Sequence, residues 1–158
     1  MSVVKTRRNS GFSLVELVTV ILLLGILSVF ALGTLVEQDD FEARGYFDDT
    51  VTAVRFAQKF AISSGCDVRV VVAAKSYSVR QSSACAANDF TGFVPNPADR
   101  GNNYQNTLGL AAFNMTAGNI TFDARGAREE ASSTFSLTDG TTTYQFTVHA
   151  STGLVEVL

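Results

Sequence analysis

The apolar residues of this chain are concentrated in one long run near the N-terminus. Between Phe12 and Val36 the only charged residue is Glu16, and the basic residues Lys5, Arg7 and Arg8 precede the run. A helix rises about 1.5 Å per residue, so the run would extend about 37 Å, more than the roughly 30 Å of a bilayer's hydrocarbon core. The run is longer than the apolar core of a secretory signal. We therefore expect a transmembrane anchor over residues 12–36.

The charges around this run predict its orientation. Basic residues lie on its N-terminal side, whereas Glu37, Asp39 and Asp40 follow it. By the positive-inside rule the N-terminus stays in the cytoplasm and the remaining chain crosses the membrane once. Glu16 is the exception within the run, since a charge in lipid costs roughly 2.5–3.5 kcal/mol on insertion scales. It is a candidate functional residue that requires a partner charge; the alternative is a polar side chain that reaches the headgroups near a helix end.

A second helical pattern follows the apolar run. Apolar residues recur at spacings of three and four, which predicts an amphipathic helix packed on a folded domain. These residues are Phe47, Val51, Val54, Ala57 and Ala61. Gly65 is the expected stop. The simplest interpretation is one long helix over residues 12–64, with Gly25, Gly33 and Gly45 as places where it could bend or unwind.

Beyond residue 65 the pattern changes to the alternation typical of β-strands. Strand-forming Val, Thr, Phe and Tyr are common, so residues 65–158 are expected to form one β-rich periplasmic domain. The expected strands are Asp67–Ala73, Tyr77–Gln81, Ile120–Asp123, Thr134–Thr138, Thr143–His149 and Leu154–Leu158. The first two form a hairpin, and the others form an antiparallel meander packed on the helix, with a turn at Asp139-Gly140. The predicted fold class is therefore α+β.

One polar segment interrupts these strands. Residues 82–107 contain Pro95, Pro97 and Gly101 and are too many for a simple turn. We interpret the segment as a surface loop, which serves either as a plain connector or as a receptor-binding loop. It contains no recognisable chemistry.

Cys66 and Cys85 are the only cysteines. The predicted topology places both outside the cytoplasm, where disulfides persist, so we expect them to form a structural disulfide. The alternative is two buried free thiols. No metal site is expected, because two cysteines and the distant His149 do not complete a ligand set.

Composition and charge argue against two classes of function. The chain has 158 residues and a net charge of −3, so broad electrostatic binding to nucleic acid is not expected. A membrane-tethered periplasmic enzyme is also disfavoured. His149 is the sole histidine and is expected to face solvent, Ser151 has no identifiable base, and Glu129-Glu130 resemble a solvated loop. No phosphate-binding glycine loop is present, and no cofactor is expected.

The N-terminal motif resembles that of a known family. Gly11-Phe12-Ser13-Leu14-Val15-Glu16-Leu17, after a short basic leader, is similar to the class III signal of type IV pilins and pseudopilins. The resemblance implies that a prepilin peptidase cleaves between Gly11 and Phe12, removes residues 1–11 and methylates the new amino terminus at Phe12. It implies that Glu16 meets the amino terminus of a neighbouring subunit during assembly. The implied partners are other pilin or pseudopilin subunits and an inner-membrane assembly platform.

The C-terminal half adds a weaker resemblance, to the GspH/FimT group of minor pilins and pseudopilins. It rests on a strand ending Phe122-Asp123-x-x-Gly126, then a hairpin, then Gly153 before a final short strand. The implied architecture is the type IV pilin-like fold. In the first use that we weigh, the chain is a minor pilin of an adhesive type IV pilus. Residues 53–59 and 64–66 resemble the C-type minor subunit of the mannose-sensitive haemagglutinin (MSHA) pilus.

Two other uses remain within this group. The alternative to the MSHA-like pilin is the H-type minor pseudopilin of type II secretion. A DNA-uptake minor pilin ranks third, because members of that kind carry a basic Gly-Arg-x-Arg segment near the C-terminus. This chain has Gly153-Leu154-Val155-Glu156 there, and the segment supplies a negative charge where phosphate binding needs positive ones.

Overall fold

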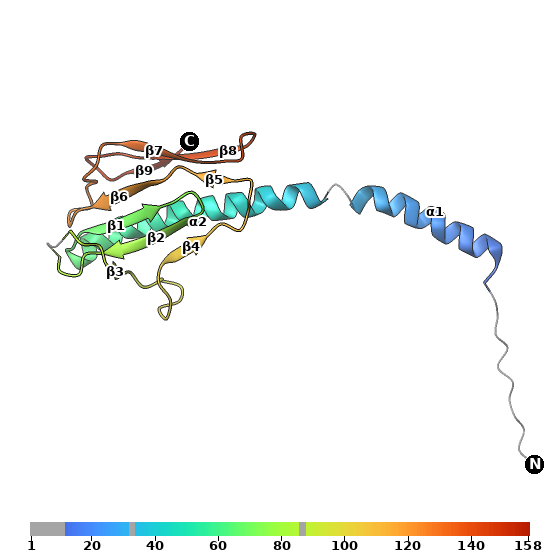
Figure 1. The fold of residues 1–158 in the computed structure, drawn as a ribbon, viewed down its shortest axis with the longest axis horizontal. Coiled ribbons are helices and arrows are strands. Elements are labelled where there is room, and N and C mark those ends of the chain that lie inside the picture. The colour runs from blue at the N-terminus through green and yellow to red at the C-terminus, as the bar shows by residue number, and fades with distance from the viewer. Residues whose placement is uncertain (1–11, 32–33, 86–87) are drawn as a thin grey trace, which may run out of the picture. The chain divides into compact units, whose positions relative to one another are not determined.

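The computed structural model describes residues 12–31, 34–85 and 88–158 (Figure 1). The chain divides into two units, Met1–Gln38 and Asp39–Leu158. The predicted leader, residues 1–11 with Gly11, lies outside the described residues, and so does Gly33.

The first unit contains helix α1 (Leu14–Ala31) and the start of helix α2 (Thr34–Ser64). The sequence predicted a single helix over residues 12–64; the structure describes helix on both sides of residues 32–33, which lie outside the described residues, so the continuity of the helix stays a prediction. Gly25 lies inside α1 and Gly45 inside α2. Over the residues that the structure describes, none of the helices combines the length and the apolar character needed to cross a membrane. The predicted span over residues 12–36 therefore stays a prediction.

The second unit is built around the C-terminal part of α2. The predicted apolar stripe is confirmed, because all five of its residues are buried. The buried face is wider than predicted and includes Ala43, Tyr46, Thr50 and Ala53. Thr50 can be buried because its hydroxyl donates to the carbonyl of Tyr46 at 2.8 Å. The helix ends as predicted: Gly65 follows Ser64 with φ +68°, a conformation that favours glycine.

Five antiparallel strands form the first sheet. They are β1 (Val68–Val72), β2 (Ser76–Gln81), β3 (Gly92–Phe93), β4 (Gln105–Thr107) and β6 (Gly118–Phe122). The order is β3-β2-β1-β6, and β4 also pairs with β2. The predicted β1–β2 hairpin is confirmed, and its central Val70 lies opposite both Val79 and Ile120.

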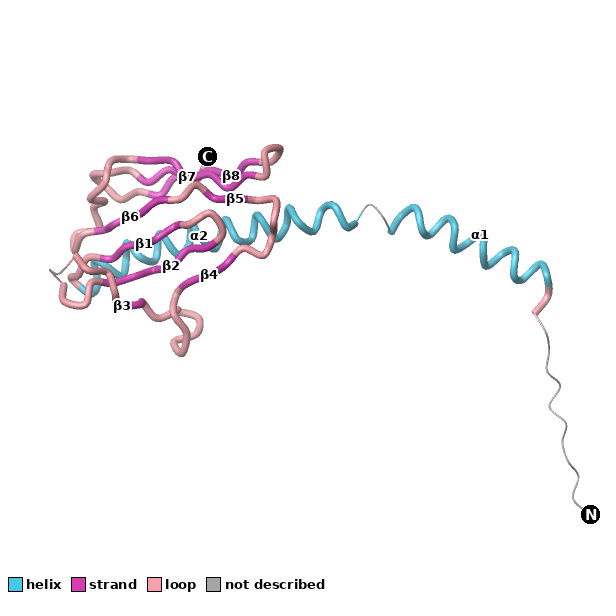
Figure 2. The backbone as a smooth tube through the Cα atoms, viewed as in Figure 1, coloured by secondary structure: helices cyan, strands magenta, loops and turns pink. Residues whose placement is uncertain are grey.

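Four further strands form the second sheet, in the order β5-β7-β8-β9. They are β5 (Asn114–Met115), β7 (Ser133–Thr138), β8 (Thr143–Val148) and β9 (Val155–Val157). The predicted turn at Asp139-Gly140 joins β7 to β8, and Phe135 pairs with Phe146 across them. Side chains from α2 and both sheets form one apolar core, and Figure 2 shows the strands of both sheets gathered around α2.

The structure corrects two sequence predictions about the sheets. The strand around Ile120 does not belong to the C-terminal meander; as β6 it pairs with β1 along its full length. The polar segment 82–107 is more than a surface loop, because β3 and β4 within it both pair with β2. Val94 and Tyr104 are buried there, and each is held by a main-chain hydrogen bond. Both errors concern pairing between distant strands, which local alternation does not encode.

Candidate functional site

The N-terminus of α1 holds the residues that the sequence singled out. Ser13 caps the helix, because its hydroxyl accepts a hydrogen bond from the Glu16 amide at 3.2 Å. Glu16 thus occupies the third helical position of a Ser-x-x-Glu capping arrangement, where the helix dipole favours a negative charge. Phe12 precedes the cap and is 81% exposed. Gly11 lies outside the described residues, so the roles of Gly11, Phe12 and Glu16 stay predictions.

The large apolar side chains of α1 are exposed where the structure describes them. Every large apolar side chain from Phe12 to Leu27 is between 46 and 81% exposed. Burial of a Val or Leu side chain contributes about 1.5–3 kcal/mol relative to exposure in water. A helix that is apolar on all sides is stable only in lipid or among other apolar helices. The carboxylate of Glu16 lies at the N-terminal end of this apolar surface, where it can form an ion pair with an ammonium group.

At the far end of α2, one side chain holds two turns together. The Gln58 amide donates to the carbonyl of Gly126 at 2.9 Å and to that of Thr152 at 3.0 Å. Gly126 and Gly153 both have positive φ. A Cβ at Gly126 would lie 2.6 Å from an Ile62 methyl carbon. These contacts place the Phe-Asp-x-x-Gly motif next to the turn that contains Gly153. From the sequence, the two were known only as parts of the same family resemblance.

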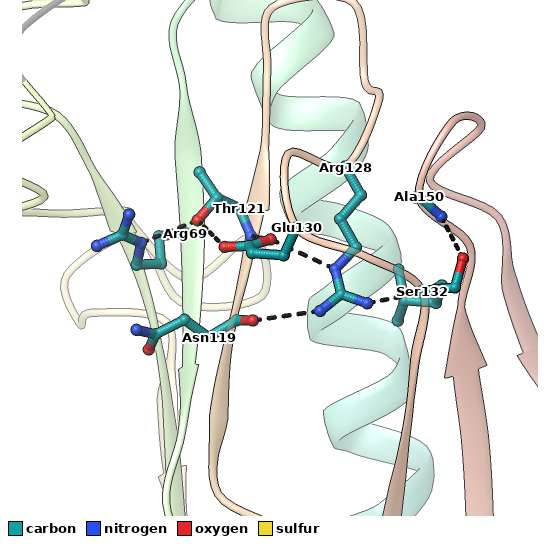
Figure 3. Close-up of polar contacts among 8 residues, drawn as sticks. Arg69, Asn119, Thr121, Arg128, Glu130, Ser132 and Ala150 are labelled. Atoms are coloured by element: carbon teal, nitrogen blue, oxygen red, sulfur yellow. Dashed lines mark hydrogen bonds and ion pairs between the residues drawn. The ribbon is translucent and has the colours of Figure 1, made fainter.

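A buried arginine links the two sheets (Figure 3). The side chain of Arg128 is 3% exposed. Its guanidinium donates to the carbonyl of Val148 in β8 at 3.0 Å and to that of Asn119 in β6 at 3.5 Å. It also pairs with Glu130 at 3.3 Å. Sequence reasoning missed this residue, because an arginine in a polar stretch between strands is usually exposed.

Glu130 was predicted to lie in a solvated loop, and the structure corrects this. Its carboxylate accepts from the Thr121 amide at 2.9 Å and from the Thr121 hydroxyl at 2.6 Å. Partial burial raises the pKa of Glu130, but the bonds from Thr121 and Arg128 outweigh it, so that the net pKa lies below its ordinary value. The Thr121 hydroxyl in turn accepts from Arg69 at 2.9 Å. The network holds the turn after β6 in place.

Two restraints hold the segment after β2. Cys66, just beyond α2, and Cys85 form a disulfide with their Cα atoms 4.4 Å apart. The carboxylate of Asp89 accepts from the Ser83 hydroxyl, and from the Ser83 amide at 2.8 Å. These bonds lower the pKa of Asp89 to about 2.

Among the described residues, no hydrogen bond joins the side chains that were considered for catalysis. His149 follows β8 and pairs with Glu156 at 3.2 Å, and both side chains are substantially exposed. Ser151 is exposed in the next turn. Across residues 12–31, 34–85 and 88–158, no three His, Cys, Asp or Glu side chains are grouped so that they could hold a metal ion.

Two segments of the chain match models of known protein families. Residues 6–32 match the prokaryotic N-terminal methylation motif, and residues 48–153 match the family described as Type II transport protein GspH. The comparison with curated proteins gives no match.

Solved structures show the same fold. The type IV minor pilin FimU of Pseudomonas aeruginosa is similar with a TM-score of 0.56 and 14% identity, over 74% of this chain and 88% of that one. The minor pseudopilin EpsH from the Type 2 Secretion System of Vibrio cholerae is similar with a TM-score of 0.57 and 16% identity, over 74% of this chain and 96% of that one.

The family model covers more than half of the chain, including the C-terminal half of α2, the whole first sheet and the second sheet except β9. The methylation motif covers the segment with Gly11, Phe12 and Glu16. The structure has the α+β, pilin-like architecture that the sequence predicted. The chain therefore belongs to the Type II transport protein GspH family, and it combines an N-terminal methylation motif with a pilin-like fold.

Proposed function

We propose that this protein is a minor pilin, a structural or priming subunit of a type IV pilus of the MSHA-like, adhesive kind. The observation that carries the proposal is the exposure of the apolar side chains of α1. A helix that exposes apolar side chains on all sides needs lipid before assembly and neighbouring helices afterwards. The subunit is stored in the inner membrane as a single-pass protein, with its β domain in the periplasm. It then joins a filament whose centre is a bundle of such helices.

Processing prepares the subunit for this role. A prepilin peptidase cuts between Gly11 and Phe12 and methylates Phe12. Removal of residues 1–11 takes away Lys5, Arg7 and Arg8, which leaves 9 basic and 15 acidic residues and a net charge of −6. The new ammonium at Phe12 of one subunit pairs with Glu16 of its neighbour near the membrane surface. An unpaired carboxylate is costly in lipid, so the pair selects correctly staggered subunits.

The second candidate is the H-type minor pseudopilin of type II secretion. The name of the matching family and the 96% coverage of EpsH favour it. DNA uptake ranks third, because the segment after Gly153 supplies Glu156 and no arginine. A membrane-tethered periplasmic enzyme ranks last, because the sequence identifies no base and orienting group for Ser151.

Mass spectrometry of the mature chain tests the proposal. The expected product lacks residues 1–11, carries one added methyl group and is found in sheared filaments. An intact N-terminus in cells that contain the peptidase, together with absence from filaments, would overturn it. Deletion of the gene separates the two candidates: a loss of surface pili indicates the minor pilin, and a loss of protein secretion with normal piliation indicates the pseudopilin.

A further inference from the structure

A single lysine bonds to the middle of the segment that connects the two sheets. This linking segment, residues 108–113, leads from β4 in the first sheet to β5 in the second (Figure 1). Lys75 belongs to the turn between β1 and β2. Its ammonium donates to the carbonyls of Leu110 at 2.7 Å and Ala111 at 2.8 Å, and also to that of Phe113. Three main-chain carbonyls thus converge on one nitrogen, and we call them the carbonyl cage.

The two ends of the linking segment are fixed to the same turn in another way. The Leu108 amide donates to the Lys75 carbonyl at 2.7 Å, and the Met115 amide donates to the Ala74 carbonyl at 2.9 Å. The side chains of Leu108 and Met115 are also buried. The cage carbonyls lie between these two anchors, and among the described residues the Lys75 ammonium is their one hydrogen-bond donor. The ends of the segment are therefore held by the main chain, whereas its middle depends on the ammonium.

The chemistry of the carbonyl cage matches a primary ammonium group. An ammonium has three N–H donors and no acceptor, so three carbonyls use all of its donors. Hydrogen bonds from a charged donor are also stronger than those between neutral groups. A calcium ion takes about six to eight oxygen ligands, and the cage supplies three. Lys75 is half-buried, so removal of its ammonium would leave three converging carbonyls without a donor, which is costly.

We propose that the carbonyl cage is a binding site for a primary ammonium group and that Lys75 is its built-in ligand. The bound ammonium closes the middle of the linking segment and thereby fixes the connection between the sheets through β4 and β5. Arg128 provides a separate link, through β6 and β8. The segment also lies against α2, since a Cβ at Gly109 would be 3.3 Å from a carboxylate oxygen of Glu42. The inference goes beyond the proposed function and does not depend on it.

Chemical rescue of the full-length chain in detergent micelles tests the site. Lys75→Ala removes the ammonium and the three carbons that carry it, and propylammonium chloride supplies the same groups as a free molecule. Limited digestion with chymotrypsin measures opening of the linking segment, as the rate of cleavage after Leu110 or Phe113 identified by fragment mass. We expect cleavage about tenfold or more faster in Lys75→Ala than in the native chain, because charge-assisted hydrogen bonds are lost. Propylammonium should return the rate toward the native value.

Two variants serve as matched controls. In Lys75→Met the thioether side chain fills the path of the lysine stem but carries no donor. This variant should be cut as fast as Lys75→Ala, and propylammonium should not protect it. Lys59 is exposed on α2, so Lys59→Ala should be cut at the native rate. Potassium chloride and calcium chloride at the same ionic strength separate N–H donation from a general effect of cations.

Four outcomes would overturn the proposal. The first is a native rate of cleavage in Lys75→Ala, because the cage would then hold without its ammonium. The second is equal protection by potassium or calcium, and the third is equal rescue of Lys75→Met. If Lys75→Ala does not fold, propylammonium should restore its native circular dichroism spectrum, and failure to do so is the fourth. None of these outcomes changes the proposed function, which is tested by processing and incorporation into filaments.

Discussion

Gly153 lies so close to Gly126 that a Cβ added to Gly153 would be 2.2 Å from the Gly126 carbonyl oxygen. Gly153 also has φ +63°. The position is therefore closed to any side chain on two separate grounds, steric contact and backbone conformation. Because Gln58 bonds to the same carbonyl, a shift of either turn would also disturb the end of α2.

We predict that Gly153→Ala destabilises the protein by about 2–4 kcal/mol, from positive φ and overpacking together. Gly65→Ala is the matched control, because Gly65 has nearly the same φ, +68°, but open space around it. That variant should lose only about 1 kcal/mol. Urea unfolding followed by far-UV circular dichroism measures both, since the chain has no Trp. Equal losses would show that the contact with Gly126 is unimportant.

Arg128→Met should lower the free energy of unfolding by about 2–4 kcal/mol, because it leaves the Val148 carbonyl and part of the Glu130 carboxylate without their partner. Arg125→Met is the control. Arg125 pairs with Asp123 at 2.8 Å, but its side chain is 86% exposed, and the cost there should be at most about 0.5 kcal/mol. The same urea titrations compare the two variants. A small loss at Arg128 would contradict its role between the sheets.

Stability should fall in acid between about pH 4 and pH 2. The pKa of Asp89 is about 2, against an ordinary value of 3.8, and bonds from the Ser83 hydroxyl and amide are the largest causes. A carboxylate with a lowered pKa in the folded state stabilises the fold above its unfolded pKa, and this contribution is lost as the pH falls toward 2. In Ser83→Ala the pKa of Asp89 should rise, which NMR titration of the carboxyl carbon measures. Asp89→Asn should make unfolding less dependent on pH in this range.

Glu16→Gln separates the charge of Glu16 from its place in the helix cap. Glutamine serves in a capping arrangement as glutamate does, so α1 should still begin after Ser13. We expect normal processing but about tenfold or greater loss of incorporation into filaments, because the carboxylate no longer meets an ammonium. Immunoblots of membrane and sheared filament fractions measure both steps. Ser13→Ala is the control for the cap, and normal incorporation of Glu16→Gln would contradict the charge pair.

Features that depend on near neighbours in the sequence were predictable here. The stripe from Phe47 to Ala61 follows from helical period, and the β7–β8 hairpin follows from alternation around Asp139-Gly140. The motif around Phe12 and Glu16 was recognisable because its residues are consecutive. None of this required knowledge of how distant segments meet.

The sequence alone determined an apolar N-terminal run, an amphipathic helix that ends at Gly65, and a β-rich remainder, because each is a local periodicity. Other features were decided only by the tertiary structure. Pairing of β6 with β1, the addition of β3 and β4 to β2, and the burial of Arg128 between two sheets needed the fold. Strand partners and the desolvation of a charge depend on residues far apart in the chain, which are brought together when α2 and both sheets share one core.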